Sequence, residues 1–236
     1  VSVHTPLPAR MRPSTFDEYV GQKHILGKGK LLRRAIDSDS FTSIIFYGPP
    51  GSGKTSLAEL IATQTNSYFT RLSGVVSNTQ ELKKEITNAI YREQTNSRKT
   101  IIFIDEIHRF NRAQQDVLLP FIENGNIRFI GATTQNPFFY VIGPLLSRSL
   151  VFHLEPLGKS DIMEIIGRAL EDNRGFPNKK IILDKDAIEF LAQVCEGDAR
   201  KALNALEIAV MSSPKKDGII RIDLSNAQES IQKKAL

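Results

Sequence analysis

Residues 43–55 constrain the fold most, because they join an apolar run to a glycine-rich turn and then to a helical pattern. The turn fits the spacing G-x-x-x-x-G-K-[ST], whose five specified places are filled by Gly48, Gly51, Gly53, Lys54 and Thr55. Glycines let successive backbone N–H groups turn inward around an anion, and the N-terminus of the following helix adds partial positive charge. The spacing therefore predicts a strand, a phosphate-binding loop and a helix.

The residue types in this loop predict how a nucleotide triphosphate and its metal ion are held. We expect Lys54 to reach the β- and γ-phosphates and the hydroxyl of Thr55 to complete the coordination of Mg²⁺. The predicted nucleotide-binding residues are Gly48, Pro49, Pro50, Gly51, Ser52, Gly53, Lys54, Thr55 and Ser56. A chance glycine-rich turn is the alternative. The apolar run before the loop and the amphipathic pattern after it argue against that alternative.

A pair of acidic residues ends a second apolar run. Residues 100–104 are β-branched or aromatic throughout, which is typical of a strand buried on both faces of a parallel sheet, and Asp105 and Glu106 follow directly. A carboxylate at the C-terminal end of such a strand lies where open α/β sheets bind ligands. We expect Asp105 to hold Mg²⁺ through water and Glu106 to orient and polarise the water that attacks the γ-phosphate. Alone, the pair would fit two solvated acids equally well; the phosphate loop upstream favours the catalytic interpretation.

Three further features supply weaker candidates. The apolar run 127–132 ends in Thr133-Thr134, and we expect Thr134 first, and Thr133 second, to hydrogen-bond the γ-phosphate or the attacking water. Tyr19-Val20 follows a basic, proline-containing arm and is predicted either to cover the nucleotide base or simply to pack on the core. His108 has no Cys or second His at ligand spacing, so we interpret it as a structural or coupling residue and not as a metal ligand.

Length and composition limit the class of protein. A chain of 236 residues, 41% of them hydrophobic, can bury a substantial core and suits one large or two modest domains. No apolar run reaches the roughly 18 residues of a membrane span, so no membrane contact is expected. Cys195 is the only cysteine, which indicates a cytoplasmic (in bacteria nucleoid-associated) or nuclear location. Lys plus Arg exceed Asp plus Glu by 31 to 26, which is compatible with a polyanionic partner but also with an ordinary solvated surface.

The pattern of elements changes near residue 156. Before this point strands and helices alternate, including a helix expected from Asn111 to about Asn124, and beyond it helical patterns predominate, with residues 219–222 as a candidate short strand. We therefore expect an α/β nucleotide-binding domain over residues 1–156 and a small helical domain over residues 157–236.

The order of these features resembles an AAA+ ATPase of the clamp-loader branch. The motifs that carry the resemblance are the glycine loop with its lysine, Asp105-Glu106, Thr133-Thr134, Leu146-Ser147-Arg148 and Gly197-Asp198-Ala199-Arg200. Within that branch, FIDEIHRFN at 103–111 and GATTQNPF at 131–138 are similar to one family. It comprises replication-associated recombination protein A and its eukaryotic relatives, the maintenance-of-genome-stability protein and the Werner-helicase-interacting protein.

The resemblance implies more than the residues show by themselves. It implies a P-loop NTPase fold with a five-stranded parallel sheet, flanking helices and a helical lid domain, in a homo-oligomer with nucleotide between neighbours. It implies that Arg148 acts in trans as an arginine finger and Arg200 in cis as a second sensor. The family continues into a helical oligomerisation domain, which we expect to lie outside residues 1–236. Gln135 stands where relatives more often have Glu.

The function implied by the resemblance is Mg²⁺-dependent hydrolysis of ATP, stimulated by DNA, at replication forks during recombination and repair. The implied partners are single-stranded DNA ends or fork structures, and replication proteins such as a single-strand-binding protein or a helicase. A clamp-loader subunit or a Holliday-junction branch-migration motor shares the same order of motifs. A nucleotide-switched scaffold without turnover is a third alternative, against which the sequence argues because Lys54, Thr55, Asp105, Glu106 and Arg148 are all present.

Overall fold

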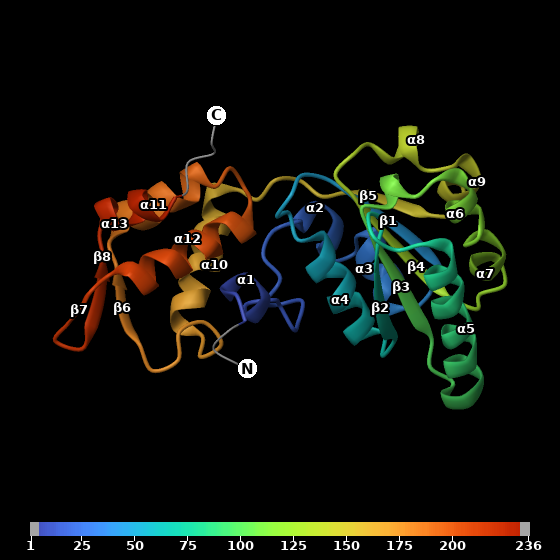
Figure 1. Cartoon of the computed structure of the whole chain (residues 1–236), viewed down its shortest axis with the longest axis horizontal. Coiled ribbons are helices and arrows are strands. Elements are labelled where there is room, and N and C mark those ends of the chain that lie inside the picture. The colour runs from blue at the N-terminus through green and yellow to red at the C-terminus, as the bar shows by residue number, and fades with distance from the viewer. Residues whose placement is uncertain (1–4, 232–236) are drawn as a thin grey trace. The chain divides into compact units, whose positions relative to one another are not determined.

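The computed structural model describes residues 5–231, and the chain divides into two compact units. Figure 1 labels the elements of both. What we call the sheet unit comprises residues 14–16 and 22–155, and what we call the lid unit comprises the described residues of 1–13, 17–21 and 156–236. None of the helices within residues 5–231 is long and apolar enough to cross a bilayer.

The sheet unit is built on five parallel strands in the order β2-β3-β4-β1-β5. The strands are β1 (Ser43–Tyr47), β2 (Tyr68–Ser73), β3 (Thr100–Asp105), β4 (Arg128–Thr133) and β5 (Leu150–His153). Parallel neighbours require crossover connections, and the apolar residues of the central strands are buried because helices cover both faces. The five-stranded α/β fold expected from the sequence is thus confirmed.

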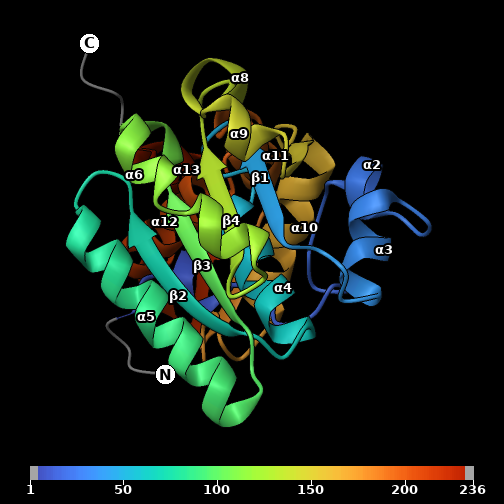
Figure 2. The same cartoon turned by 90° about the vertical axis from the view of Figure 1, so that its right-hand side faces the viewer.

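Helices lie on both sides of this sheet (Figures 1 and 2). On one side, the long helix α5 (Thr79–Asn96), α7 (Leu119–Glu123) and α9 (Gly143–Leu146) contribute to one apolar cluster with β3. On the other side, α4 (Lys54–Gln64) packs against β2, β3 and β4, and α3 (Leu31–Asp37) packs against α4. The remaining short helices of the unit are α2 (Lys23–Leu26), η1 (Ile107–Arg109), α6 (Arg112–Asp116) and α8 (Pro137–Tyr140).

The single helix expected over residues 111–124 is wrong. The structure has the two short helices α6 and α7 instead, separated at Val117–Leu118. Pro120 lies in the first turn of α7 and has no backbone N–H, so a continuous helix would lose a hydrogen bond and place the proline ring against the preceding turn.

The lid unit is a helical bundle with a small sheet. Its helices are α1 (Leu7–Arg10), α10 (Lys159–Glu171), α11 (Lys185–Val194), α12 (Ala199–Ser212) and α13 (Leu224–Ser230), and their apolar faces share one core. The strands are β6 (Lys180–Leu183), β7 (Lys215–Lys216) and β8 (Ile219–Ile222), in the order β6-β8-β7. The candidate strand at 219–222 is confirmed. The other two strands are too short and too exposed to give a periodic signal.

The N-terminal arm departs from the expected domain boundary. Residues 5–13 and 17–21 group with the lid unit, although the sequence assigned them to the α/β domain. Leu7 is fully buried in the apolar core of the lid helices, and its backbone N–H donates to Oε2 of Glu207 at 2.9 Å. Arg10 forms an ion pair with the same carboxylate at 2.6 Å. Contacts across so long a stretch of chain leave no local pattern in the sequence.

Candidate active site at the carboxyl edge of the sheet

The strand order brings the two main sequence motifs to one edge of the sheet. β4 lies between β1 and β3; Asp105 of β3 is in register with Ala132 of β4, and Thr133 of β4 with Tyr47 of β1. Neighbouring strands lie about 4.8 Å apart, so the glycine loop that follows Tyr47 starts on the order of 10 Å from Asp105. The phosphate loop and the acidic pair therefore border the same region.

The glycine loop has a backbone shape that requires glycine. Gly48, Gly51 and Gly53 have φ values of 151°, 69° and 97°, which L side chains rarely adopt. A Cβ atom on Gly48 would lie 2.1 Å from the carbonyl oxygen of Leu154. Gly53 caps the N-terminus of α4. The loop thus leads directly into a helix N-terminus, where free N–H groups and the helix dipole favour an anion.

The side chains of the loop close it on itself. Nζ of Lys54 donates to the carbonyl oxygens of Gly48 at 2.8 Å and Pro49 at 2.7 Å, and Oγ of Ser52 donates to that of Pro49 at 2.9 Å. Lys54 is buried, so its ammonium group is held within the cradle that the sequence predicts for phosphate. Of the other predicted residues, Gly51, Ser52 and Thr55 are buried, Ser56 is half-buried, and Pro50 is exposed at the tip.

Gln22 supports the loop and was not among the sequence candidates. Its Nε2 donates to the carbonyl oxygens of Ser52 at 3.3 Å and Glu155 at 2.8 Å, and its Oε1 accepts the N–H of Glu155 at 3.0 Å. Gln22 is buried, so this amide ties the glycine loop to the segment that leaves β5. No sequence signal was available, because the partners lie far along the chain.

The two acids have different surroundings. Oδ2 of Asp105 pairs with Nη2 of Arg71 on β2 at 2.6 Å, a partner that the sequence analysis did not identify. Glu106 has a φ of 58°, which is uncommon for a residue with a side chain, so the chain turns sharply after β3. The turn is crowded: a Cβ on Gly74, in the segment after β2, would lie 2.2 Å from the carbonyl oxygen of Glu106. The neighbouring segment after β2 therefore restricts the backbone at the acidic pair.

A chain of polar contacts leads from Glu106 to β4. Oε2 of Glu106 lies 3.2 Å from Nε2 of His108, and Nδ1 of His108 lies 2.8 Å from Oγ1 of Thr133. The same hydroxyl accepts the backbone N–H of Gln135 at 2.9 Å. Thr133 is fully buried, whereas Thr134 is half-buried. Thr133 thus contacts His108, which in turn contacts Glu106. The contact of Thr134 with a phosphate stays a prediction.

The oxygen donors at this edge suit Mg²⁺. The hydroxyl of Thr55 and the carboxylate of Asp105 are hard oxygen ligands of the kind that Mg²⁺ prefers. Among residues 5–231, no group of three or more His, Cys, Asp or Glu could hold a metal ion by itself. Most ligands of the ion would therefore have to be phosphate oxygens and water, which is the usual arrangement for Mg²⁺ bound with a nucleotide.

Arg148 lies on the surface of the sheet unit, just after α9. Its Nε pairs with Oε1 of Glu123 on α7 at 2.6 Å, and its Nη1 donates to the carbonyl oxygen of Pro144 at 2.9 Å. The side chain is 41% exposed, and exposed ion pairs of this kind contribute little to stability. The guanidinium group is thus accessible and weakly held, and its action in trans stays a prediction.

The remaining three predicted residues belong to the lid unit. Tyr19 and Val20 are half-buried, and burial raises the pKa of the Tyr19 phenol, which keeps it neutral. Arg200 is exposed in the first turn of α12, where its backbone N–H donates to Oδ1 of Asp198 at 2.9 Å. The contacts of these residues with a nucleotide stay predictions.

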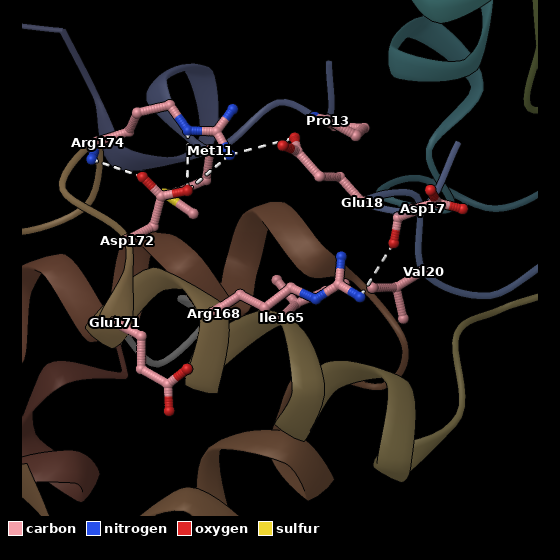
Figure 3. A pocket seen from close by; sticks show the side chains of 10 residues that line it. All are labelled: Met11, Pro13, Asp17, Glu18, Val20, Ile165, Arg168, Glu171, Asp172 and Arg174. Atoms are coloured by element: carbon pink, nitrogen blue, oxygen red, sulfur yellow. Dashed lines mark hydrogen bonds and ion pairs between the residues drawn. The ribbon is translucent and has the colours of Figure 1, made fainter. Parts of the chain in front are cut away.

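Val20 also lines a cavity of about 400 Å³ within the lid unit (Figure 3). Arg174 pairs there with Asp172 at 2.6 Å and Glu18 at 3.1 Å, and its hydrogen bonds lower the pKa of Asp172. The lining residues are Met11, Pro13, Asp17, Glu18, Val20, Ile165, Arg168, Glu171, Asp172 and Arg174. Four carboxylates against two guanidinium groups disfavour a phosphate at this place.

Comparison with known proteins agrees with this geometry. Residues 44–154 match the family model described as "ATPase family associated with various cellular activities (AAA)", and residues 177–236 match the AAA C-terminal domain. The chain belongs to the AAA+ ATPases. Both parts of the AAA+ pattern, the nucleotide-binding domain and the domain that follows it, are thus present in this chain.

Within the AAA+ ATPases, the chain is similar to proteins of the family that the motifs at 103–111 and 131–138 predict. The chain is 44% identical over 225 residues to replication-associated recombination protein A of Haemophilus influenzae, covering 95% of this chain and 50% of that protein. It is 47% identical over 205 residues to the protein of the same name from Escherichia coli K12, covering 86% and 45%. It is 43% identical over 208 residues to ATPase WRNIP1 of Dictyostelium discoideum, covering 88% and 24%. The resemblance to this family is confirmed, and the chain spans half or less of the length of these relatives.

The fold is also similar to solved AAA+ structures. The Thermotoga maritima RuvB Holliday junction branch migration motor matches with a TM-score of 0.71 at 26% identity, covering 94% of this chain and 72% of that chain. This likeness extends over both units of the chain.

Proposed function

We propose that this AAA+ chain binds MgATP at the carboxyl edge of the sheet unit and hydrolyses it to ADP and phosphate. The observation that carries the proposal is the strand order: only β4 separates the strand before the glycine loop from the strand that ends in Asp105-Glu106. The two motifs together supply an anion cradle, hard oxygen ligands for a metal ion and a carboxylate for the attacking water.

Each residue has a distinct role in this proposal. The N–H groups of the glycine loop hold the phosphate chain, Lys54 contacts the β- and γ-phosphates, and Thr55 and Asp105 hold Mg²⁺, directly and through water. Mg²⁺ supplies neutralisation of the charge on the phosphate oxygens. Glu106 orients a water molecule whose oxygen bonds to the γ-phosphorus as the bond to the β–γ bridging oxygen breaks. Glu106 accepts a proton of that water, and ADP leaves.

The remaining predicted residues complete the proposal. Thr134 hydrogen-bonds the γ-phosphate or the attacking water, Tyr19 and Val20 cover the base, and Arg200 contacts the phosphates from the same chain. Arg148 reaches the nucleotide of a neighbouring subunit in a homo-oligomer. Its exposure and its weak ion pair support this role, because an arginine finger must leave its own surface to act.

We propose further that DNA stimulates the hydrolysis, at single-stranded ends or fork structures, in recombination and repair at replication forks. The names of the relatives and the formal net charge of +5 support this proposal. Replication proteins, such as a single-strand-binding protein or a helicase, are the expected partners.

Phosphate release with and without DNA ends, at two salt concentrations, tests both proposals. We expect MgATP-dependent release that DNA increases, and an increase that falls steeply as salt rises, because phosphate contacts release counterions. Release that DNA does not change at either salt concentration would refute DNA stimulation and leave the hydrolysis intact. No release under any condition would refute the hydrolysis.

A branch-migration motor is the second candidate, favoured by the TM-score of 0.71 with RuvB. ATP-dependent unwinding of a synthetic four-way junction would support it, and the same assay on a forked duplex separates it from the first proposal. A clamp-loader subunit would instead bind a sliding clamp in an ATP-dependent manner.

A further inference from the structure

We propose that His108 is a positioning residue, which holds the carboxylate of Glu106 and connects it to the end of β4. The inference rests on the proposed hydrolysis, because it assigns a part in that reaction to a side chain that does not touch the nucleotide.

Both ring nitrogens of His108 are engaged. Nε2 lies 3.2 Å from Oε2 of Glu106, Nδ1 lies 2.8 Å from Oγ1 of Thr133, and only 10% of the imidazole is exposed. Thr133 is fully buried at the end of β4, so the far end of this contact is fixed to the central sheet. Glu106, whose side chain is 34% exposed, is the more exposed end.

The contacts define where the protons lie. An Nε2 lone pair facing a carboxylate would be repulsive, so Nε2 carries a proton and donates it to Glu106. The hydroxyl of Thr133 accepts the N–H of Gln135 at 2.9 Å, and its own proton has two acceptors in reach, Nδ1 at 2.8 Å and the carbonyl oxygen of Gln135 at 3.4 Å. We assign the proton to the shorter contact, with Nδ1. With a neutral imidazole, each group donates a hydrogen bond to the next: the backbone N–H of Gln135 to Thr133, Thr133 to His108, and His108 to Glu106.

The imidazole is also held from its sides. The ring of Tyr140 on α8 contacts it edge-on, with the ring centroids 5.9 Å apart. The backbone around that tyrosine is fixed by Gln115, whose Nε2 donates to the carbonyl oxygens of Phe110 at 2.9 Å and Tyr140 at 3.0 Å. Gln115 is buried, and its Oε1 accepts the N–H of Ile142 at 3.0 Å. The segment after β3 and the segment after β4 therefore clamp His108 between them.

The expected consequence is a loss of turnover with little loss of binding. Glu106 can present one carboxylate oxygen to the attacking water while the other is held by His108. Without the imidazole the carboxylate samples other rotamers, and misplacement by about 1 Å can cost up to about a hundredfold in rate. The proposal assigns nucleotide binding to the glycine loop and the metal ligands and assigns only the orientation of Glu106 to His108, so the affinity for ATP is expected to depend on other residues.

Two replacements at His108 separate the two contacts. The amide nitrogen of Gln can occupy the place of Nε2, and that of Asn the place of Nδ1. We expect His108→Gln to keep most of kcat, while His108→Asn and His108→Ala lose about 10- to 100-fold with an unchanged Kd for ATP. Thr133→Val should lower kcat and Thr133→Ser should restore it, because only the hydroxyl takes part. Circular dichroism and thermal unfolding check that each variant is folded.

The proposal is overturned if the wild-type protein hydrolyses ATP and the His108→Asn and His108→Ala variants do so with an unchanged kcat. A rise in Kd that accounts for the whole loss would also overturn it, since the residue would then act on binding. A wild type without turnover refutes the hydrolysis instead. In that case ¹⁵N spectra of the histidine ring still decide the geometry: we expect a protonated Nε2 and an unprotonated, hydrogen-bonded Nδ1, and the opposite tautomer contradicts the assignment.

Discussion

Lys54 and Glu106 separate nucleotide binding from chemistry at the level of single residues. Lys54 supplies a buried positive charge inside the glycine loop, whereas Glu106 follows β3, which β4 separates from the strand before the loop. Lys54→Ala should therefore weaken ATP binding by at least tenfold, measured by titration with a fluorescent ATP analogue. An unchanged Kd in a variant that is folded by circular dichroism would contradict the assignment of the loop.

Cys195 gives a second test at this scale. Cys195 is 1% exposed, and burial raises the pKa of its thiol to about 11, so the thiol is protonated and unreactive near neutral pH. We expect it to react with a thiol reagent such as Ellman's reagent only when the lid unit unfolds, so that the rate follows denaturant concentration. A fast stoichiometric reaction in native buffer would show that the packing around α11 is wrong.

The residues predicted from the sequence are those whose signal is local. The glycine loop and Asp105-Glu106 can be identified from the spacing of their residues and from the apolar run before each of them. Gln22 and Arg71 gave no such signal, because their partners lie on other strands or loops. The sequence alone is compatible with a structural or a coupling role for His108. Its contact with Thr133 forms because β3 and β4 are neighbours in the sheet, and the order of strands in a sheet cannot be read from motif spacing.

At the scale of elements, Arg148 contacts α7 through Glu123 and α9 through the carbonyl oxygen of Pro144. If Arg148 acts in trans, Arg148→Ala should bind ATP normally and lose only the turnover that depends on protein concentration. Mixing it with Lys54→Ala should recover activity, because the second variant supplies the arginine and the first an intact glycine loop. Glu123→Gln is the matched control, and its assembly-dependent turnover should be unchanged or higher. Loss of ATP binding in Arg148→Ala, or no recovery on mixing in a preparation that assembles, would count against the assignment.

The N-terminal arm is the second prediction at this scale. Leu7 is fully buried against the lid helices, so Leu7→Ala should lower the free energy of unfolding of the lid unit by about 2–5 kcal/mol. Leu224→Ala is the matched control, since that side chain is 38% exposed, and it should cost much less. Denaturant unfolding followed by circular dichroism measures both; equal and small losses would show that α1 does not belong to the lid core.

The elements themselves were predictable where they were long or apolar. The central strands and the lid helices carry clear patterns, but Pro120 divides the helix expected over 111–124. The strands β6 and β7 were missed, since the four residues Lys-Ile-Ile-Leu and the two residues Lys-Lys are too short and do not alternate between apolar and polar. The end of β5 and the start of the lid unit lie close to the change of pattern near residue 156.

For the whole molecule, the account depends on a nucleotide held by the sheet unit and on assembly that brings in further residues. The chain spans half or less of the length of these relatives, so the relatives contain sequence beyond the part that this chain matches. Tests of the proposed assembly, of the preferred DNA structure and of the protein partners therefore call for proteins of that full length. The cleavage of ATP, in contrast, is assigned to side chains of this chain.

The most direct test compares wild type with Glu106→Gln in a single experiment that follows ATP binding and phosphate release together. The account predicts that both proteins bind MgATP with similar Kd, that wild type releases phosphate, and that the variant retains bound ATP with release lowered by at least a hundredfold. Equal rates of release from the two proteins would contradict the account, because the water would then be activated without the carboxylate that follows β3.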